Sequence, residues 1–136
     1  MDDGPAALLL AIHGQFRAAS ARLVELAHRD VAILARIFVP LAQTLHHHHH
    51  AEEAMLFPLV EKRTGTAPSR LVDDHGELTA AITAVETALR SRAAVPAAIT
   101  AFDRVLVEHL DREEALVLPV LRAMSPAEAW AQIHGG

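Results

Sequence analysis

The sequence contains neither cysteine nor tyrosine, and only 4% of its 136 residues are aromatic. The absence of cysteine excludes disulfides, thiolate nucleophiles, thiolate-ligated zinc and cysteine-held iron–sulfur clusters, and the absence of tyrosine excludes phenolate ligands. Positive charge is scarce as well, because 12 Lys and Arg face 17 Asp and Glu, for a formal net charge of −5. This imbalance repels phosphate backbones and anionic lipid, so we expect no nucleic-acid partner.

Long hydrophobic runs and targeting signals are also missing. Asp2 and Asp3 stand where a signal peptide carries positive charge, and the early apolar run is interrupted at His13. Arg36 splits the longest apolar stretch, which is too short for the ~20 residues that span a bilayer. We therefore expect a cytoplasmic protein with no membrane partner.

Size and composition instead indicate one globular helical domain. A chain of 136 residues suits a single domain over 1–136, and a hydrophobic content of 51% is sufficient for a buried core. Runs of β-branched residues are short, whereas Ala, Leu, Glu and Arg dominate, and this composition favours helix.

Turn residues divide the chain into four expected helices. Their predicted spans are about 5–28, 31–63, 69–92 and 96–124. Pro40 lies inside the second span and either kinks that helix or marks a later start. Ser125 and Glu128 have the spacing of a capping box, which predicts a last short helix. Because short connections force antiparallel neighbours, the sequence predicts an all-α, antiparallel up-down-up-down four-helix bundle with a short C-terminal helix.

Each predicted helix carries an apolar stripe at alternating steps of three and four residues, which is the face that a bundle buries. The stripe residues are Leu9, His13, Phe16, Ser20 and Leu23; Phe38, Leu41, Leu45, His48, Glu52, Met55 and Leu59; Leu71, His75, Leu78, Ile82, Val85 and Leu89; and Phe102, Leu106, His109, Glu113, Leu116 and Val120. Polar residues interrupt all four stripes. Histidine and glutamate are therefore expected inside the core.

These buried polar residues need compensation. Burying an unpaired polar group costs a few kcal/mol, and an unpaired carboxylate costs more, against a total stability of only ~5–15 kcal/mol. Direct Glu–His pairing would supply part of the compensation. Metal coordination supplies it better, because imidazole and carboxylate each exchange hydration for a bond to a cation. The candidate metal ligands are His13, His48, Glu52, His75, His109 and Glu113.

Two HxxxE motifs make this interpretation more specific. His48 and Glu52, like His109 and Glu113, are four residues apart and so share one helix face. In both copies a proline follows this glutamate by six residues. That offset and the stripe favour His48 and Glu52 over the neighbouring pair at 49 and 53, which has the same spacing. A register shifted by one stays open as the alternative.

The order H, HxxxE, H, HxxxE covers nearly the whole chain and resembles the hemerythrin-like family, also called the HHE cation-binding domain. The resemblance implies a four-helix bundle around two iron ions, a non-haem di-iron centre with an oxo or hydroxo bridge. Transferred to this chain, it implies one iron on His13 and His48, the other on His75 and His109, and bridges from Glu52 and Glu113.

Two departures from oxygen-carrying hemerythrin bear on function. Thr79 stands where that pattern has a second histidine on the third helix, and the last motif is HxxxE rather than HxxxxD. Four histidines and two bridging carboxylates fill about eight of the roughly twelve positions around two six-coordinate ions, which leaves room for other ligands. His47 or His49 would fill one of them.

The resemblance implies a protein that binds, senses or reduces a small oxidant, namely dioxygen, peroxide or nitric oxide. Two alternatives stay open. In the first, the chain is a module for iron storage or sensing without turnover. In the second, a metal such as zinc only stabilises the bundle.

Several polar residues outside the stripes are also of interest. His46 and His50 are four residues apart and point away from the stripe, so they either hold a second, exposed metal ion or form a solvated face. Glu53, Asp74 and Glu114 are candidates to accept the free N–H of a ligand histidine, the alternative being that each is a surface charge.

Overall fold

The structure, a computed structural model, describes residues 4–125, 127–128 and 131. In this part the chain forms helices and connections only, which confirms the all-helical prediction. The elements are α1 (Pro5–Leu26), α2 (Val31–Ala51), the π-helical turn η1 (Glu52–Leu56), α3 (Phe57–Thr64), α4 (Ser69–Ser91) and α5 (Val95–Arg122). None of the described helices is both long and apolar enough to cross a membrane.

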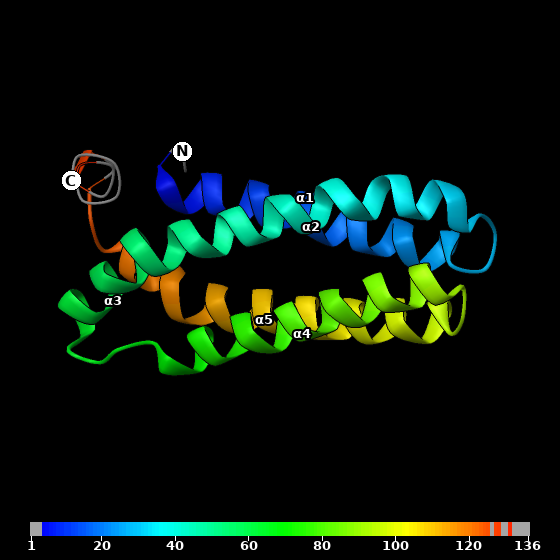
Figure 1. Ribbon diagram of the computed structural model, residues 1–136. Coiled ribbons are helices and arrows are strands. Elements are labelled where there is room, and N and C mark those ends of the chain that lie inside the picture. Colours follow the sequence, from blue (N-terminus) through cyan, green and yellow to red (C-terminus); the bar gives the residue numbers. More distant parts are fainter. Residues whose placement is uncertain (1–3, 126, 129–130, 132–136) are drawn as a thin grey trace.

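The long helices lie side by side along one axis (Figure 1). The α1–α2 and α4–α5 connections lie at one end of the molecule, and the loop from α3 to α4 lies at the other end with the start of α1. Helix α5 packs against α1 and α4, and α2 also packs against α1 and α4. Each long helix therefore presents two different faces to two neighbours.

Local sequence signals set most of the helix ends. The Asp30 side chain caps α2 by accepting a hydrogen bond from the Ile33 N–H at 3.0 Å. Gly65 ends α3 in the left-handed conformation with φ of 80°. Because α2 starts at Val31, Pro40 lies within the helix and does not mark a later start.

The predicted spans need small corrections. The first helix ends at Leu26 rather than near residue 28, because the Leu26 carbonyl accepts from the N–H groups of both Arg29 and Asp30 in a closing turn. The last long helix covers 95–122 instead of 96–124. Glu128 donates its N–H to the Ser125 hydroxyl at 3.1 Å, as the capping spacing predicts, but the expected short helix includes residues outside the described ranges.

The second predicted helix is not one continuous α-helix, because η1 interrupts it at 52–56. A π turn holds an extra residue, so it shifts the phase of every side chain after it. Met55 was expected in the core and is 38% exposed, whereas Leu56 is buried in its place. In α5 the buried stripe steps from Glu113 to Val117, so the prediction that Leu116 is buried is also wrong, and Leu116 is 40% exposed.

The apolar core consists of two clusters. One includes Leu45 and Leu78, and the other includes Leu56 and Leu71. Residues 48–52 of α2 and η1, and His75 of α4, fall between these clusters along the chain. The histidines and glutamates of the four stripes therefore form a layer that separates two apolar halves.

Two glycines in different conformations give a test of this backbone. Gly14 lies within α1 and a Cβ there meets no atom within 4 Å, so Gly14→Ala should raise the free energy of unfolding by about 0.5–1 kcal/mol. Gly65 has φ of 80°, so Gly65→Ala should lower the free energy of unfolding by about 1–2 kcal/mol. Denaturant unfolding of the metal-free protein measures both. Changes of the same sign would contradict the assigned conformations.

Candidate metal centre

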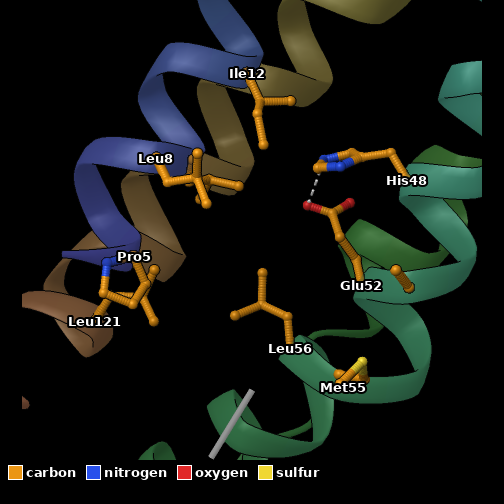
Figure 2. Close-up of a pocket in the computed structure, with 10 residues that line it drawn as sticks. Pro5, Leu8, Ile12, His48, Glu52, Met55, Leu56 and Leu121 are labelled. Atoms are coloured by element: carbon orange, nitrogen blue, oxygen red, sulfur yellow. Dashed lines mark ion pairs between the residues drawn. The ribbon is translucent and has the colours of Figure 1, made fainter. Parts of the chain in front are cut away.

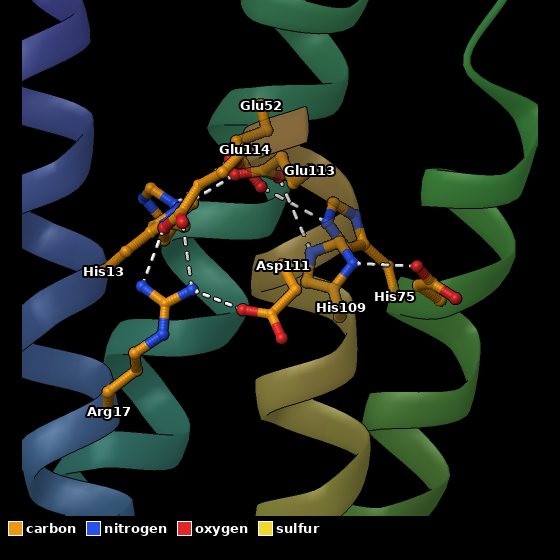
Figure 3. Close-up of polar contacts among 10 residues, drawn as sticks. His13, Arg17, Glu52, His75, His109, Asp111, Glu113 and Glu114 are labelled. Carbon is orange, nitrogen blue, oxygen red and sulfur yellow. Dashed lines mark hydrogen bonds and ion pairs between the residues drawn. The ribbon is translucent and has the colours of Figure 1, made fainter. Parts of the chain in front are cut away.

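Seven side chains converge in the polar layer, namely the six predicted ligands and His49 (Figure 3 labels five of the six, His13, Glu52, His75, His109 and Glu113). They come from all four long helices and η1. All are buried except His48, whose side chain is 16% exposed. Their nitrogen and oxygen atoms form two groups, within each of which the atoms lie within 4.8 Å of one another. The groups are His13, His48, Glu52 and Glu113, and His49, Glu52, His75 and His109.

The two carboxylates lie between these groups. Glu113 places Oε2 2.8 Å from His13 Nε2 and Oε1 3.5 Å from His109 Nε2. Glu52 places Oε2 3.2 Å from His48 Nε2 and Oε1 3.2 Å from His75 Nε2. Each carboxylate therefore faces one histidine of α1 or α2 with one oxygen and one histidine of α4 or α5 with the other.

The outer nitrogen of three of these histidines is fixed by a second carboxylate. His13 Nδ1 lies 2.8 Å from Glu114 Oε2, His75 Nδ1 lies 3.0 Å from Glu53 Oε1, and His109 Nδ1 lies 3.1 Å from Asp74 Oδ2. Of the two interpretations that the sequence left open for these carboxylates, acceptor of a histidine N–H or surface charge, these contacts favour the first. Because an ionised carboxylate only accepts, Nδ1 carries the hydrogen, and an imidazole without a second proton then points its Nε2 lone pair inward.

Arginines hold two of the outer carboxylates in place. Arg17 donates to both Glu114 oxygens at 2.7 and 3.0 Å, and Arg112 donates to both Asp74 oxygens at 2.8 and 2.9 Å. Burial opposes ionisation of both acids, but the hydrogen bonds from arginine and histidine outweigh it and lower the pKa of each. Sequence reasoning missed both arginines. The only signal is their position within one helical turn of His13 and His109.

The inward-facing atoms have no hydrogen-bond partners. In the described part of the chain, nine buried side-chain nitrogen and oxygen atoms make no hydrogen bond, and all nine belong to this centre. They are Nε2 of His13, His48, His49, His75 and His109, and both carboxylate oxygens of Glu52 and Glu113. By contrast, Ser20, another polar stripe residue, donates to Asp103 at 2.7 Å. Such a set of lone pairs without donors fits a cation site.

The electrostatics suit ligands for a cation. Burial, with neighbouring histidines, lowers the pKa of His49 to about 2, and burial also lowers the pKa of His48, so both rings are neutral. Burial raises the pKa of Glu52, and the nearby Glu113 adds to the shift. For Glu113, the close approach of the His109 and His13 rings outweighs the effect of burial and lowers the pKa. The pKa values of the two neighbouring acids therefore shift in opposite directions.

His49 is the inward-facing residue that the stripe did not include. Adjacent residues of an α-helix point about 100° apart, so His48 faces α1 while His49 faces α4. The His49 ring stacks on His75 with ring centroids 3.9 Å apart and an interplanar angle of 14°. The inner carboxylate is Glu52, as predicted, and Glu53 points outward to His75 Nδ1. The sequence signal that could have found His49 is the second contact face that each helix has in a four-helix bundle.

Comparison with known proteins identifies the family. The family model described as "Hemerythrin HHE cation binding domain" matches residues 4–121. No curated protein and no solved structure matches the chain. The match includes all seven residues of the centre and confirms the resemblance noted from the H, HxxxE, H, HxxxE order.

The outer hydrogen bonds give a test of the centre. Asp74→Asn removes the ionised acceptor that orients His109, and we expect metal binding to weaken about 10–100-fold by competitive titration. Asp73→Asn is the matched control, because Asp73 is exposed, and it should bind metal like the wild type. Equal losses in the two variants would show that Asp74 does not orient a ligand.

The substitution Asp74→Asn should also change how the stability of the fold depends on pH. The pKa of Asp74 lies below the ordinary value of 3.8, so ionised Asp74 stabilises the fold above that value and loses this effect as the pH falls through the lowered pKa. In metal-free Asp74→Asn, the stability of the fold should not show this loss as the pH falls.

Proposed function

The chain belongs to the hemerythrin HHE cation-binding family, and we propose that it is a non-haem di-iron protein that binds, senses or reduces a small oxidant such as dioxygen, peroxide or nitric oxide. In this proposal the helices form an antiparallel up-down-up-down bundle. One iron is held by His13 and His48, and the other by His49, His75 and His109. Glu52 and Glu113 bridge the two ions. The nine inward atoms without hydrogen-bond partners carry this proposal.

The donor set supports iron over zinc. Structural zinc sites are almost always tetrahedral and four-coordinate. Here five imidazole nitrogens and four carboxylate oxygens surround two positions, which gives four donors to one ion and five to the other when both carboxylates bridge, and five donors exceed the tetrahedral set of zinc. Imidazole combined with carboxylate at this coordination number suits iron.

The donor count also supports binding of an exogenous ligand. Nine protein atoms leave about three of the twelve positions of two six-coordinate ions without a protein donor. The group with His13 and His48 has two imidazoles and the other group has three, so more of the free positions lie on the former. Two iron(II) ions in such a centre supply two electrons to an oxidant.

A cavity of about 180 Å³ adjoins this two-histidine group (Figure 2). His48 and Glu52 line its inner side, and its other walls are apolar, with Leu8, Ile12 and Met55 among them. A cavity of this size admits small molecules only. Its apolar walls favour uncharged diatomic molecules over peroxide, because a polar molecule loses hydrogen bonds to water on entering.

Metal loading tests the proposal directly. Metal-free protein supplied with iron(II) without oxygen should bind two ions per chain and, after oxidation, show the near-ultraviolet charge-transfer bands of an oxo-bridged pair. Glu52→Ala and Glu113→Ala should lose metal severely, because each removes a bridge between the ions. Glu53→Ala should retain two ions with affinity lowered about 10–100-fold, because Glu53 orients His75 and bridges neither ion.

The outcomes of these measurements separate the competing functions. A chain that never binds two iron ions refutes the proposal. Equal losses for Glu52→Ala, Glu113→Ala and Glu53→Ala would show that the carboxylate register is wrong. A metal whose removal lowers the melting temperature, with no metal-centred redox change, would favour a metal-stabilised bundle.

The apolar cavity predicts how oxidants reach the centre. Leu8→Trp places a large side chain in the cavity wall and should slow the reaction of the iron(II) protein with dioxygen or nitric oxide several-fold in stopped-flow measurements. Iron content should not change. Leu116→Trp is the control, since Leu116 is similarly exposed and lies outside this cavity. Equal reaction rates in Leu8→Trp and Leu116→Trp would exclude this route. Separately, rapid multiple turnover of an oxidant by the iron-loaded protein would exclude a passive binding role.

A further inference from the structure

A second cavity, of about 350 Å³, reaches the centre from the flank between α2 and α4. Its exposed lining includes His46, His50 and Glu53, and its buried lining includes His49 and His75. The exposed residues therefore form a rim, and two of the inward-facing histidines form the floor. The cavity described above opens instead beside α1, where His48 lies.

The rim consists of metal-ligating groups. His46 and His50 are one helical turn apart on α2, and imidazole and carboxylate both bind divalent cations. The Glu53 side chain is 42% exposed, compared with 17% for Glu114 and 0% for Asp74, so it is the most accessible of the three outer carboxylates. Its Oε1 lies 3.0 Å from His75 Nδ1. Ligands therefore continue from the surface to the floor.

Small residues on α4 keep this cavity open. Gly76 lines it without a side chain, and a Cβ at that position meets no atom within 4 Å. Thr79, also in the lining, turns its hydroxyl back to the His75 carbonyl at 2.9 Å. Gly76 and Thr79 therefore place no large side chain over the His49 and His75 rings on this side.

The apolar cavity beside α1 does not suit an ion. A dication that loses its hydration among leucine and methionine side chains receives no ligand in exchange until it reaches His48 and Glu52. Along the α2–α4 flank, each lost water is replaced by an imidazole or a carboxylate.

We propose that the α2–α4 cavity is the entry port for iron(II), in which His46, His50 and Glu53 bind the hydrated cation transiently and pass it to His49 and His75. This proposal rests on the proposed di-iron function. It accounts for the run of five histidines at 46–50, three of which line this cavity while His48 faces the other flank.

The rate of iron uptake tests the port. Metal-free protein is mixed with iron(II) without oxygen, and a fast iron(II) chelator added at intervals reports how much iron has become protected. The double variant His46→Ala/His50→Ala should take up iron about tenfold more slowly, because the rim no longer concentrates the cation. His47→Ala is the matched control, since His47 is an exposed histidine of the same run outside the cavity lining. All three proteins should reach two ions per chain.

A second pair of variants blocks the cavity without removing a ligand. Gly76→Leu should also slow uptake, because the new side chain fills open space in the cavity. Gly14→Leu is its control, since Gly14 is likewise an exposed helical glycine that directly follows an inward-facing histidine. Wild-type uptake rates in either the double variant or Gly76→Leu would overturn the port. A third ion held stably at the rim would overturn it as well.

Failure of the port is distinguishable from failure of the di-iron function. If the wild type binds two ions at a rate that none of these substitutions changes, the port is wrong and the di-iron centre stands. If the wild type does not bind two ions, the di-iron centre itself is wrong.

Discussion

The repulsion between inward-facing lone pairs is the constraint on which the rest of this structure depends. Outer carboxylates bind Nδ1 of His13, His75 and His109, so the Nε2 lone pairs of these rings face carboxylate oxygens. A proton relieves one such contact, but nine atoms without donors cannot share one proton favourably. A pair of cations relieves all of them together. The arrangement that suits a cation is thus built from the periphery inward, through Arg17 and Arg112 and the acids they hold.

The same layer shapes the fold around it. It separates the buried apolar side chains of the described residues into two clusters, one on each side of the centre. Each cluster draws residues from several helices, and burial of these residues favours the folded chain before any metal binds. Ligands from α1, α2, η1, α4 and α5 meet between the clusters, so in the proposed function a bound metal pair would cross-link all the long helices. Metal binding is therefore coupled to the packing of both halves.

Much of the fold and of the centre could be predicted from the sequence, because helical periodicity marks the buried face directly. It placed His13, His75 and His109 inside, and the offset of the prolines selected Glu52 over Glu53. The π turn at 52–56 has no sequence signal of its own, so the prediction that Met55 is buried failed there. The two arginines could not be assigned because their partners come from other helices. Such contacts exist only after the helices pack.

The run at 46–50 shows how one helix serves two flanks. Helix α2 contacts both α1 and α4, and neighbouring residues point about 100° apart, so His48 borders the apolar cavity while His49 borders the polar one. A neutral diatomic molecule crosses apolar walls at little cost, whereas a hydrated dication needs a ligand for each water that it loses. In the proposed function these two species have to reach the same centre. Two cavities with different linings meet both requirements. A lining that is apolar enough for the diatomic molecule offers too few ligands to the dication.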